Sequence, residues 1–507
     1  MAVARPIEGA GRSDTRTTAV TTPPSYGSRA LPYLPLALLL LVQAVSAARL
    51  QNSPFQDEAL YLSYGQWMID SWVDGVPMDG DPEQWFTGAP QLYPVFAALL
   101  DGIGGLTLVR LFSALCMLSA TAAVYWTATT LFRGPGHLGV GAFAALVFAA
   151  SGPVLVLTRF ATFDAPSIAA VAWALAVGCW AARRDDGRER WWAVLVGGLL
   201  ALAVALKYAS AIDAPFVLLA VAASTLHEPA RRLRGLAVSV VAGLTALALL
   251  AVSAGTWARS LVSGVVASTI ERQSLMPLPA TELLARIAAE AGPMIAVGLV
   301  GGLVLLRRRP VLGAVLLVAS VAAPLYQVHT GESVSLYKST VLGLVFGAVL
   351  GGYLCSLLIR RWWGAPLAVV GLIWAVLYGQ SVSASIFTSW PDTARLADAV
   401  GPLVVDSPGF RIAGENPEPL QYALGDRTEP WQWIGTYDGA FEYEGQADLP
   451  AFRAALSDGY FGVVVLDGET TIGRQLQQEI ASFGYEQEAV VDTADGDHRW
   501  VVWQLTP

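Results

Sequence analysis

The sequence predicts a polytopic α-helical membrane protein with a small α/β domain at its C-terminal end. Of the 507 residues, 54% are hydrophobic and only 14% are charged. Apolar runs long enough to cross a hydrocarbon layer of ~30 Å recur along the chain. After about residue 383 the apolar runs shorten to strand length and alternate with helical patterns. We therefore expect three regions: a tail over 1–30, a membrane domain over 31–382 and an α/β domain over 383–507.

Residues 1–30 are rich in Thr, Pro, Ser and Gly and have no apolar period, so we expect a disordered cytoplasmic tail. About eleven spans follow, and we interpret the first as a retained helix rather than a cleaved signal peptide. The segment 191–226 leaves two alternatives open, two spans or one long helix with a re-entrant piece. The candidate spans are 31–48, 106–132, 138–157, 165–182, 191–207, 212–226, 235–254, 291–306, 311–326, 339–359 and 365–382.

Arginine clusters predict the orientation of the spans, because short cytoplasmic loops collect positive charge. Counting through eleven spans places every cluster on the side of the N-terminus. The expected location is therefore a bacterial plasma membrane, with a cytoplasmic N-terminus and an extracytoplasmic domain after about residue 383. The clusters are Arg12 and Arg16; Arg133; Arg183, Arg184, Arg188 and Arg190; Arg231, Arg232 and Arg234; Arg307 to Arg309; and Arg360 with Arg361.

The C-terminal domain is expected to alternate strands and helices. The runs Pro402 to Asp406 and Phe461 to Asp467 predict strands, and Trp500 to Leu505 predicts a closing strand. A helical pattern covers 471–483. No motif in this region indicates a function.

Composition excludes several function classes. The three cysteines, Cys116, Cys179 and Cys355, lie far apart within predicted spans, which favours small core residues over a disulfide framework or a zinc site. The four histidines have no metal-binding spacing. A net charge of -9 argues against nucleic acid as a partner.

The first outer loop, 49–105, carries two adjacent carboxylates, Asp57 and Glu58, soon after the first span. An ionised pair there cannot pack favourably against apolar side chains or lipid, so it indicates the acid/base centre of an enzyme at the outer membrane surface. A surface helix from Gln56 to Trp72 would place Asp57 and Tyr61 one turn apart on one face. Aromatic side chains of this loop suit either a sugar-stacking wall or interfacial anchoring; they are Tyr61, Tyr64, Trp67, Trp72, Trp85, Phe86 and Tyr93.

The second outer loop is short and holds Arg159 and Asp164 between two apolar runs. Asp164 suits a helix cap, with Pro166 in the first turn of the following helix. Capping explains the Asp but not the Arg, so we favour a functional role for the loop.

Lysine occurs only twice, at Lys207 and Lys338, and both map to outer ends of spans. Each alone suits a snorkelling anchor, but the two together on the side of Asp57 favour a phosphate or pyrophosphate site. The loop before the tenth span adds His329, Glu332 and Tyr337 as hydrogen-bonding candidates. A helix starting near Ser335 would place Tyr337 and Lys338 in its first turn, where free N–H groups also favour anions.

Four segments resemble the GT-C glycosyltransferases that use polyprenyl-phosphate sugars, in particular the bacterial branch related to protein O-mannosyltransferases and lipid A aminoarabinose transferases. The segments are Asp57 to Tyr61, Gly88 to Pro94, Arg159 to Asp164 and Ser335 to Lys338. The resemblance covers about residues 31–380. It implies a GT-C-like membrane domain in which Asp57 acts at the acceptor, beside Glu58, and Asp164 organises the site. The family pattern commonly has His where this chain has Tyr337 or Ser339.

The residues predict the same chemistry by themselves. Displacing a polyprenyl phosphate from a sugar needs a base for the incoming hydroxyl and positive charge for the departing phosphate. Asp57 is the expected base, and Arg159, Lys207 and Lys338 would supply the charge. A divalent cation, Mg²⁺ or Mn²⁺, held by Asp57, Glu58 or Asp164 is a further option. A single displacement would invert the anomeric configuration.

The predicted function is therefore transfer of a sugar, a hexose or a pentose, from a polyprenyl-phosphate donor to an extracytoplasmic acceptor. Wall polysaccharide, glycolipid and protein are all suitable acceptors. Two alternatives are a lipid-linked sugar flippase or transporter, and a non-catalytic assembly protein of the cell envelope. No inverted repeat is evident, and the polar residues gather on one face rather than at the membrane midplane, which disfavours the transporter.

Overall fold

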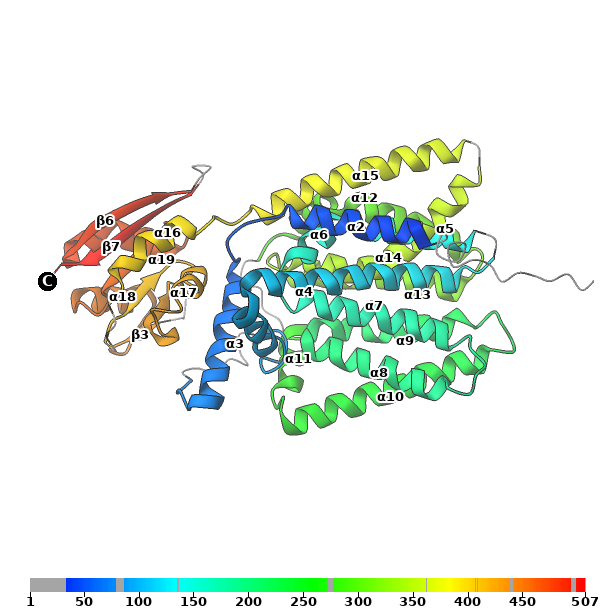
Figure 1. The fold of residues 1–507 in the computed structure, drawn as a ribbon, viewed down its shortest axis with the longest axis horizontal. Coiled ribbons are helices and arrows are strands. Elements are labelled where there is room, and N and C mark those ends of the chain that lie inside the picture. The colour runs from blue at the N-terminus through cyan, green and yellow to red at the C-terminus, as the bar shows by residue number, and fades with distance from the viewer. Residues whose placement is uncertain are drawn as a thin grey trace, which may run out of the picture.

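The structure is a computed structural model that describes residues 33–78, 86–134, 136–271, 277–361, 363–405, 407, 409–436, 441–493 and 498–506. Figure 1 shows a bundle of long helices and, at one end of it, a smaller part that contains a sheet. The predicted tail over 1–30, Trp85 and Asp406 lie outside the described residues.

Apolar helices account for every predicted span. Eight helices of the described chain are long and apolar enough to cross a membrane, and α5 (His137–Ala149) with α6 (Gly152–Arg159), bent by 74° at their junction, makes a ninth. Two shorter apolar segments are α2 (Leu34–Ala48) and Tyr208–Ser224, which comprises η3 (Tyr208–Ile212) and α9 (Ala214–Ser224). The chain is thus a multi-pass helical membrane protein. The eight helices are α4 (Tyr93–Leu131), α7 (Asp164–Ala181), α8 (Glu189–Leu206), α10 (Arg232–Thr256), α12 (Ala280–Leu306), α13 (Pro310–Thr330), α14 (Leu336–Ile359) and α15 (Gly364–Phe387).

The segment 191–226 is not one continuous helix. Helix α8 ends at Leu206, and Lys207 has an extended backbone with φ -144° and ψ 111°. The short helix η3 and then α9 follow. The break places the lysine at the end of a helix instead of within one.

The predicted start of the second span at residue 106 coincides with a kink in α4. Gly104 and Gly105 have non-helical dihedral angles, and the φ of Gly105 is 64°. Glycine adopts a positive φ without the penalty of a Cβ atom. The part of α4 before the kink therefore belongs to the predicted outer loop.

Helix α3 (Gln56–Asp74) crosses the end of the bundle that faces the sheet-containing part (Figure 1). It confirms the helix predicted from Gln56. Helix α3 approaches α4 closely at Gly65, where an added Cβ would lie 2.0 Å from the carbonyl oxygen of Pro94. A short helix, α11 (Leu261–Thr269), contacts η3 at the same end of the bundle.

The C-terminal part contains a five-stranded sheet in the order β2-β1-β5-β7-β6. Strands β1 and β2 and strands β1 and β5 pair in parallel, whereas β7 pairs antiparallel with β5 and β6. The strands are β1 (Ile412–Gly414), β2 (Trp433–Gly435), β5 (Val463–Leu466), β6 (Tyr485–Asp492) and β7 (Arg499–Leu505), and β3 (Glu442–Tyr443) with β4 (Gln446–Ala447) forms a separate pair. The helices are α16 (Ala394–Val400), η4 (Gly401–Leu403), α17 (Glu418–Ala423), η5 (Pro430–Gln432), α18 (Asp448–Ser457), α19 (Thr471–Glu479) and η6 (Ile480–Phe483).

The α/β class of this part is confirmed, with one local error. Strands β5 and β7 and the helices α19 and η6 match the predicted elements. The run from Pro402 is not a strand, because η4 covers Gly401–Leu403 and no strand follows in the described residues before β1. Proline has no N–H to donate to a strand ladder, which explains the error.

The linker after α15 is tied to the segment that enters α3. The side chain of Asn52 donates to the carbonyls of Phe387 and Trp390, at 3.3 and 2.9 Å. The hydroxyl of Ser53 accepts from the backbone N–H of Thr393 at 3.0 Å, and the indole of Trp390 donates to the Ser53 carbonyl at 3.0 Å. We call these contacts the linker latch.

Candidate functional site

Four charged side chains, from three helices and from the residue that follows α8, meet at the end of the bundle beside α3. Lys338 Nζ lies 2.5 Å from Asp57 Oδ2 and 3.6 Å from Asp164 Oδ2. Lys207 Nζ donates a hydrogen bond to Asp164 Oδ1. The two lysines and the two aspartates therefore form one charge-balanced cluster, which we call the Asp–Lys cluster.

The cluster is buried on one side and open on the other. The Asp164 side chain has no exposed surface, and both lysine side chains are 6% exposed, whereas the Asp57 side chain is 26% exposed. Ionised groups away from water are costly unless they are paired, so the pairing is what keeps this cluster stable. Asp57 is the member that an incoming molecule can reach.

Asp164 does not cap α7. It is the first residue of that helix, and its side chain makes no capping bond to the backbone. Its Oδ2 instead accepts a hydrogen bond of 2.7 Å from Thr162 Oγ1, in addition to the lysine contacts. The cap interpretation of Asp164 is wrong, and its carboxylate is directed to the two lysines.

The segment from Phe86 to Leu92 determines where Lys207 lies. The N–H of Ala89 donates to the carbonyl of Ala205 at 2.8 Å, and the N–H of Tyr208 donates to the carbonyl of Thr87 at 2.8 Å. An added Cβ at Gly88 would lie 2.0 Å from the carbonyl oxygen of Leu206. Only glycine allows this close approach, so Gly88 fits the loop against the end of α8 beside the lysine.

Helix α14 begins at Leu336, so Tyr337 and Lys338 lie in its first turn, where the sequence places them. The Lys338 ammonium lies 5.5 Å from the ring centroid of Phe160 and 5.9 Å from that of Tyr337. These aromatic faces surround the charged group.

Glu58 faces away from the cluster and pairs with Arg110. Two hydrogen bonds, of 2.9 and 2.6 Å, join the guanidinium to the two carboxylate oxygens. The same carboxylate accepts from the backbone N–H of Ala161 at 2.7 Å and of Phe55 at 3.0 Å. Both Glu58 and Arg110 are buried. The pair connects α3, α4 and the loop after α6, and so holds Asp57 in place.

Sequence reasoning missed Arg110. A signal for it existed, because a lone arginine in the outer part of an apolar span indicates a buried charge partner. The guanidinium also donates to the carbonyl of Asn52 at 2.9 Å and lies 5.4 Å from the ring of Phe387, so it connects the Glu58 pair with the linker latch.

The three predicted metal ligands do not form one metal site. Glu58 is saturated by Arg110 and two backbone N–H groups. The Lys338 ammonium lies between the carboxylates of Asp57 and Asp164, where a cation would otherwise have to sit. Among the described residues, one group has metal-ligating atoms close together, and it lies in the C-terminal part: Asp467, Glu469 and His498.

Most aromatic residues of the first outer loop pack together. The ring of Tyr61 lies 4.9 Å from Phe163, 5.4 Å from Phe86 and 5.9 Å from Tyr93. Tyr64 and Trp67 are also buried, whereas Trp72 is 60% exposed. These buried rings form neither an open sugar-stacking wall nor an interfacial belt. Burial, together with the nearby Asp57, raises the pKa of the Tyr61 phenol well above its usual range, so it stays a hydrogen-bond donor.

The remaining candidates lie in different surroundings. Arg159 ends α6, is half-buried and makes no ion pair among the described residues, and its Nε is buried without a hydrogen-bond partner there. His329 is exposed at the end of α13. Glu332 is buried, and its carboxylate accepts a hydrogen bond of 2.8 Å from the N–H of Val334. Arg159 thus carries a positive charge that no described carboxylate neutralises, whereas Glu332 stabilises the turn around Val334 by its hydrogen bond.

Comparison with known proteins supports the predicted resemblance. Residues 90–257 match the family model described as dolichyl-phosphate-mannose-protein mannosyltransferase. This region includes Arg159, Asp164 and Lys207, and excludes Asp57 and Lys338. No curated protein matches the chain significantly in sequence.

Solved structures of low sequence identity share the fold. The apo oligosaccharyltransferase of Archaeoglobus fulgidus aligns with a TM-score of 0.59 and 13% identity, over 92% of this chain and 74% of that one. Apo ArnT from Cupriavidus metallidurans aligns with a TM-score of 0.59 and 15% identity, over 95% of this chain and all of that one (100%). ArnT bound to undecaprenyl phosphate gives a TM-score of 0.58 and 14% identity, over 94% and 98%. The chain has the GT-C fold predicted from its sequence.

Proposed function

We propose that the protein is a membrane glycosyltransferase that moves a sugar from a polyprenyl-phosphate donor to an extracytoplasmic acceptor. The observation that carries the proposal is the Asp–Lys cluster, in which the partly exposed Asp57 pairs with the buried Lys338, and the buried Asp164 contacts both lysines. The fold adds support, because one structural neighbour is bound to undecaprenyl phosphate and another to a dolichol-phosphate and an inhibitory peptide.

Asp57 is the proposed base for the acceptor. The acceptor oxygen would form a bond to the anomeric carbon of the sugar while the bond from that carbon to the phosphate oxygen breaks. The acceptor proton would pass to the Asp57 carboxylate, and the leaving phosphate would depart as an anion. This single displacement inverts the anomeric configuration.

The two lysines and Arg159 are the proposed phosphate-binding groups. The Asp–Lys cluster is neutral by itself, since two ammonium groups balance two carboxylates. Positive charge for the phosphate would then come from the unpaired Arg159 and from Lys338, when Lys338 exchanges a carboxylate for the phosphate. No step of this mechanism requires a divalent cation, because Lys338 supplies the charge between the two aspartates.

Other candidates take supporting roles in this proposal. Asp164 orients both lysines, and Glu58 positions Asp57 through the Arg110 pair. Tyr61 and Tyr337 flank the cluster as hydrogen-bond donors near the sugar. His329 is the least connected candidate, and we assign it a contact with the donor lipid at the rim.

Replacing Asp57 tests the proposal most directly. Asp57→Asn keeps the size of the side chain but removes the base, so turnover should fall by roughly 100-fold or more while donor binding survives. Transfer would be measured with purified protein, a polyprenyl-phosphate sugar and a mixture of glycolipid, polysaccharide and peptide acceptors. Asp74→Asn is the matched control, because Asp74 is exposed at the far end of the same helix.

Folded Asp57→Asn protein that transfers sugar at the wild-type rate would refute the base assignment. Movement of the lipid-linked sugar across vesicle membranes without any transfer would instead favour a flippase.

A further inference from the structure

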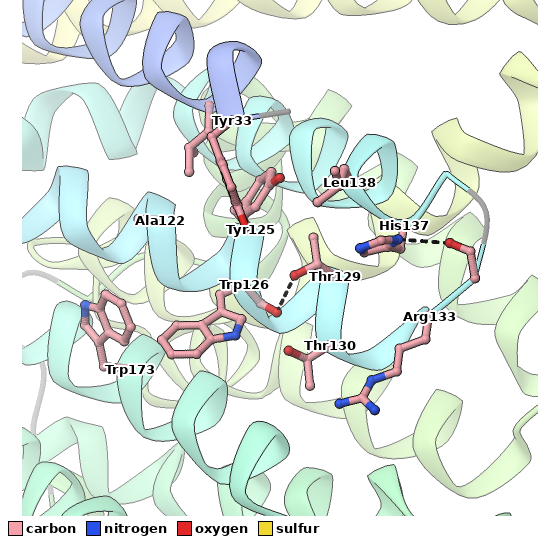
Figure 2. A pocket seen from close by; sticks show the side chains of 12 residues that line it. Tyr33, Ala122, Tyr125, Trp126, Thr129, Thr130, Arg133, His137, Leu138 and Trp173 are labelled. Atoms are coloured by element: carbon pink, nitrogen blue, oxygen red, sulfur yellow. Dashed lines mark hydrogen bonds between the residues drawn. The ribbon is translucent and has the colours of Figure 1, made fainter. Parts of the chain in front are cut away.

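Figure 2 shows a pocket, whose volume is about 710 Å³. It opens at the end of the bundle opposite to the Asp–Lys cluster. Residues of α2, α4, α5 and α7 and of the turn between α4 and α5 line it. It lies where α4 ends, after Leu131, and where α2 begins, after Tyr33. The cluster lies at the other ends of these helices, so the pocket is separate from the proposed transfer site.

The described residues that line the pocket offer hydrogen-bond donors, and none of them is an aspartate or a glutamate. Arg133 is exposed on its rim and makes no ion pair among the described residues. Thr130 is buried, with 5% of the residue surface exposed. Its hydroxyl has no hydrogen-bond partner in the described structure. The indole N–H groups of Trp126 and Trp173 are likewise without a described acceptor. Such a set of donors is complementary to an anion.

The lining changes from apolar to cationic along one face of α4. Ala122, Trp126 and Thr130 follow one another over a helical rise of roughly 12 Å, and Arg133 lies two residues after the end of α4. Leu36 of α2 and the Trp126–Trp173 pair, whose ring centroids are 5.5 Å apart, add to the apolar side. An occupant that fits this gradient has an apolar chain and an anionic head. Free phosphate would leave the apolar side unfilled.

We propose that this pocket binds one anionic phospholipid, with the lipid phosphate at Arg133 and Thr130 and the start of an acyl chain against the two tryptophans. Arginine and hydroxyl donors bind phosphate by charge-assisted hydrogen bonds. The arginine-rich end of a membrane protein is also the end where anionic lipid headgroups are attracted. The site does not depend on the proposed transfer reaction.

Native mass spectrometry of the purified full chain in detergent tests the proposal. The probes are dioleoylphosphatidylglycerol and dioleoylphosphatidylcholine, titrated separately. The wild-type protein should hold one phosphatidylglycerol more tightly than phosphatidylcholine. Arg133→Ala should weaken phosphatidylglycerol binding by about tenfold or more, the effect of one charge-assisted hydrogen bond. Thr130→Val, which keeps side-chain shape, should weaken it by a smaller factor.

Arg308→Ala is the matched control. Arg308 is an exposed arginine at the same end of the bundle, since its neighbour Arg309 donates to the carbonyl of Leu131, and it does not line the pocket. This variant should bind like the wild type. Thermal unfolding in detergent verifies that each variant is folded.

Three results would overturn the proposal. Equal weakening by Arg133→Ala and Arg308→Ala would mean diffuse attraction to the arginine-rich surface. Equal retention of the two lipids would mean that the headgroup charge is not recognised. Displacement of phosphatidylglycerol by glycerol 3-phosphate at matching concentration would mean a site for a soluble phosphate instead of a lipid.

Discussion

At the scale of single residues, the two lysines of the chain have different environments although both belong to one cluster. Lys207 pairs with Asp164, which has no exposed surface, whereas Lys338 also pairs with Asp57, whose side chain is 26% exposed. Water can solvate Asp57 if its lysine is removed, but it cannot reach Asp164. The two alanine variants should therefore fail in different ways.

Lys207→Ala should destabilise the protein by about 3–5 kcal/mol, because it leaves a buried carboxylate without its closest cation. The double variant Lys207→Ala/Asp164→Asn should recover much of that stability without recovering transfer. Lys338→Ala should lose less stability and should mainly raise the KM for the donor, with partial rescue by Lys338→Arg. Thermal unfolding and donor titration measure the two effects. If both single variants transfer sugar normally, the lysines serve only to neutralise the buried carboxylates and do not bind the donor phosphate.

The adjacent carboxylates Asp57 and Glu58 should also differ. Glu58 is fully buried and bonded to Arg110 and to two backbone N–H groups, so Glu58→Gln leaves a buried arginine without its counter-ion. We expect Glu58→Gln to lower the free energy of unfolding by about 3–5 kcal/mol, whereas Asp57→Asn should lower it less, because Lys338 keeps Asp164 as a counter-ion at 3.6 Å. The free energies of unfolding would be measured by denaturing the two variants and the wild type in the same detergent. A Glu58→Gln protein as stable as the wild type would contradict the positioning role of the pair.

At the scale of elements, the linker latch joins the C-terminal part to the helix that carries Asp57. The segment 52–55 is held by Asn52 and Ser53 to the linker at 387–393, and by Arg110 to the bundle. Helix α17 packs on α3, and Tyr422 donates a hydrogen bond of 2.8 Å to Asp101. The position of α3 therefore depends on contacts from both parts of the chain.

Loosening the latch should impair transfer without unfolding the bundle. Asn52→Ala removes two hydrogen bonds to the linker, so we expect a several-fold lower kcat and faster proteolysis between residues 387 and 393. Ser389→Ala is the control, because the exposed Ser389 hydroxyl bonds only to the carbonyl of Ile386 among the described residues. Unchanged kcat and proteolysis in Asn52→Ala would show that the latch does not position α3.

The success of sequence reasoning varied with the range of the interactions. Helix α3 and the apolar helices of the eleven predicted spans follow from local periodicity and composition, and they were predictable, whereas the helical turns of α4 before the kink at Gly104 and Gly105 were not. The lysines and aspartates could be assigned to one face but not paired. The Arg110–Glu58 pair, 52 residues apart, required tertiary packing that no local pattern encodes. The short strands β1 and β2, of three residues each, are too brief for an alternating pattern.

At the scale of the whole molecule, the arginine clusters of different loops meet at one end of the bundle. Arg309 donates to the carbonyl of Leu131, Arg183 to that of Ser224, and Arg234 pairs with Asp185. The loops that the sequence places on one side of the membrane are thus in mutual contact. Their contact supports the span count, and which side of the membrane they occupy stays a prediction.

Labelling of single cysteines tests that orientation. The native Cys116, Cys179 and Cys355 would first be replaced, since they lie within the helices of the bundle. A membrane-impermeant maleimide should then label Glu488→Cys, an exposed position in strand β6, in intact cells. Arg190→Cys, exposed at the arginine-rich end, should react only after the membrane is disrupted, because cytoplasmic loops collect the positive charge. The reverse pattern would place the Asp–Lys cluster on the cytoplasmic side and would exclude transfer to an extracytoplasmic acceptor.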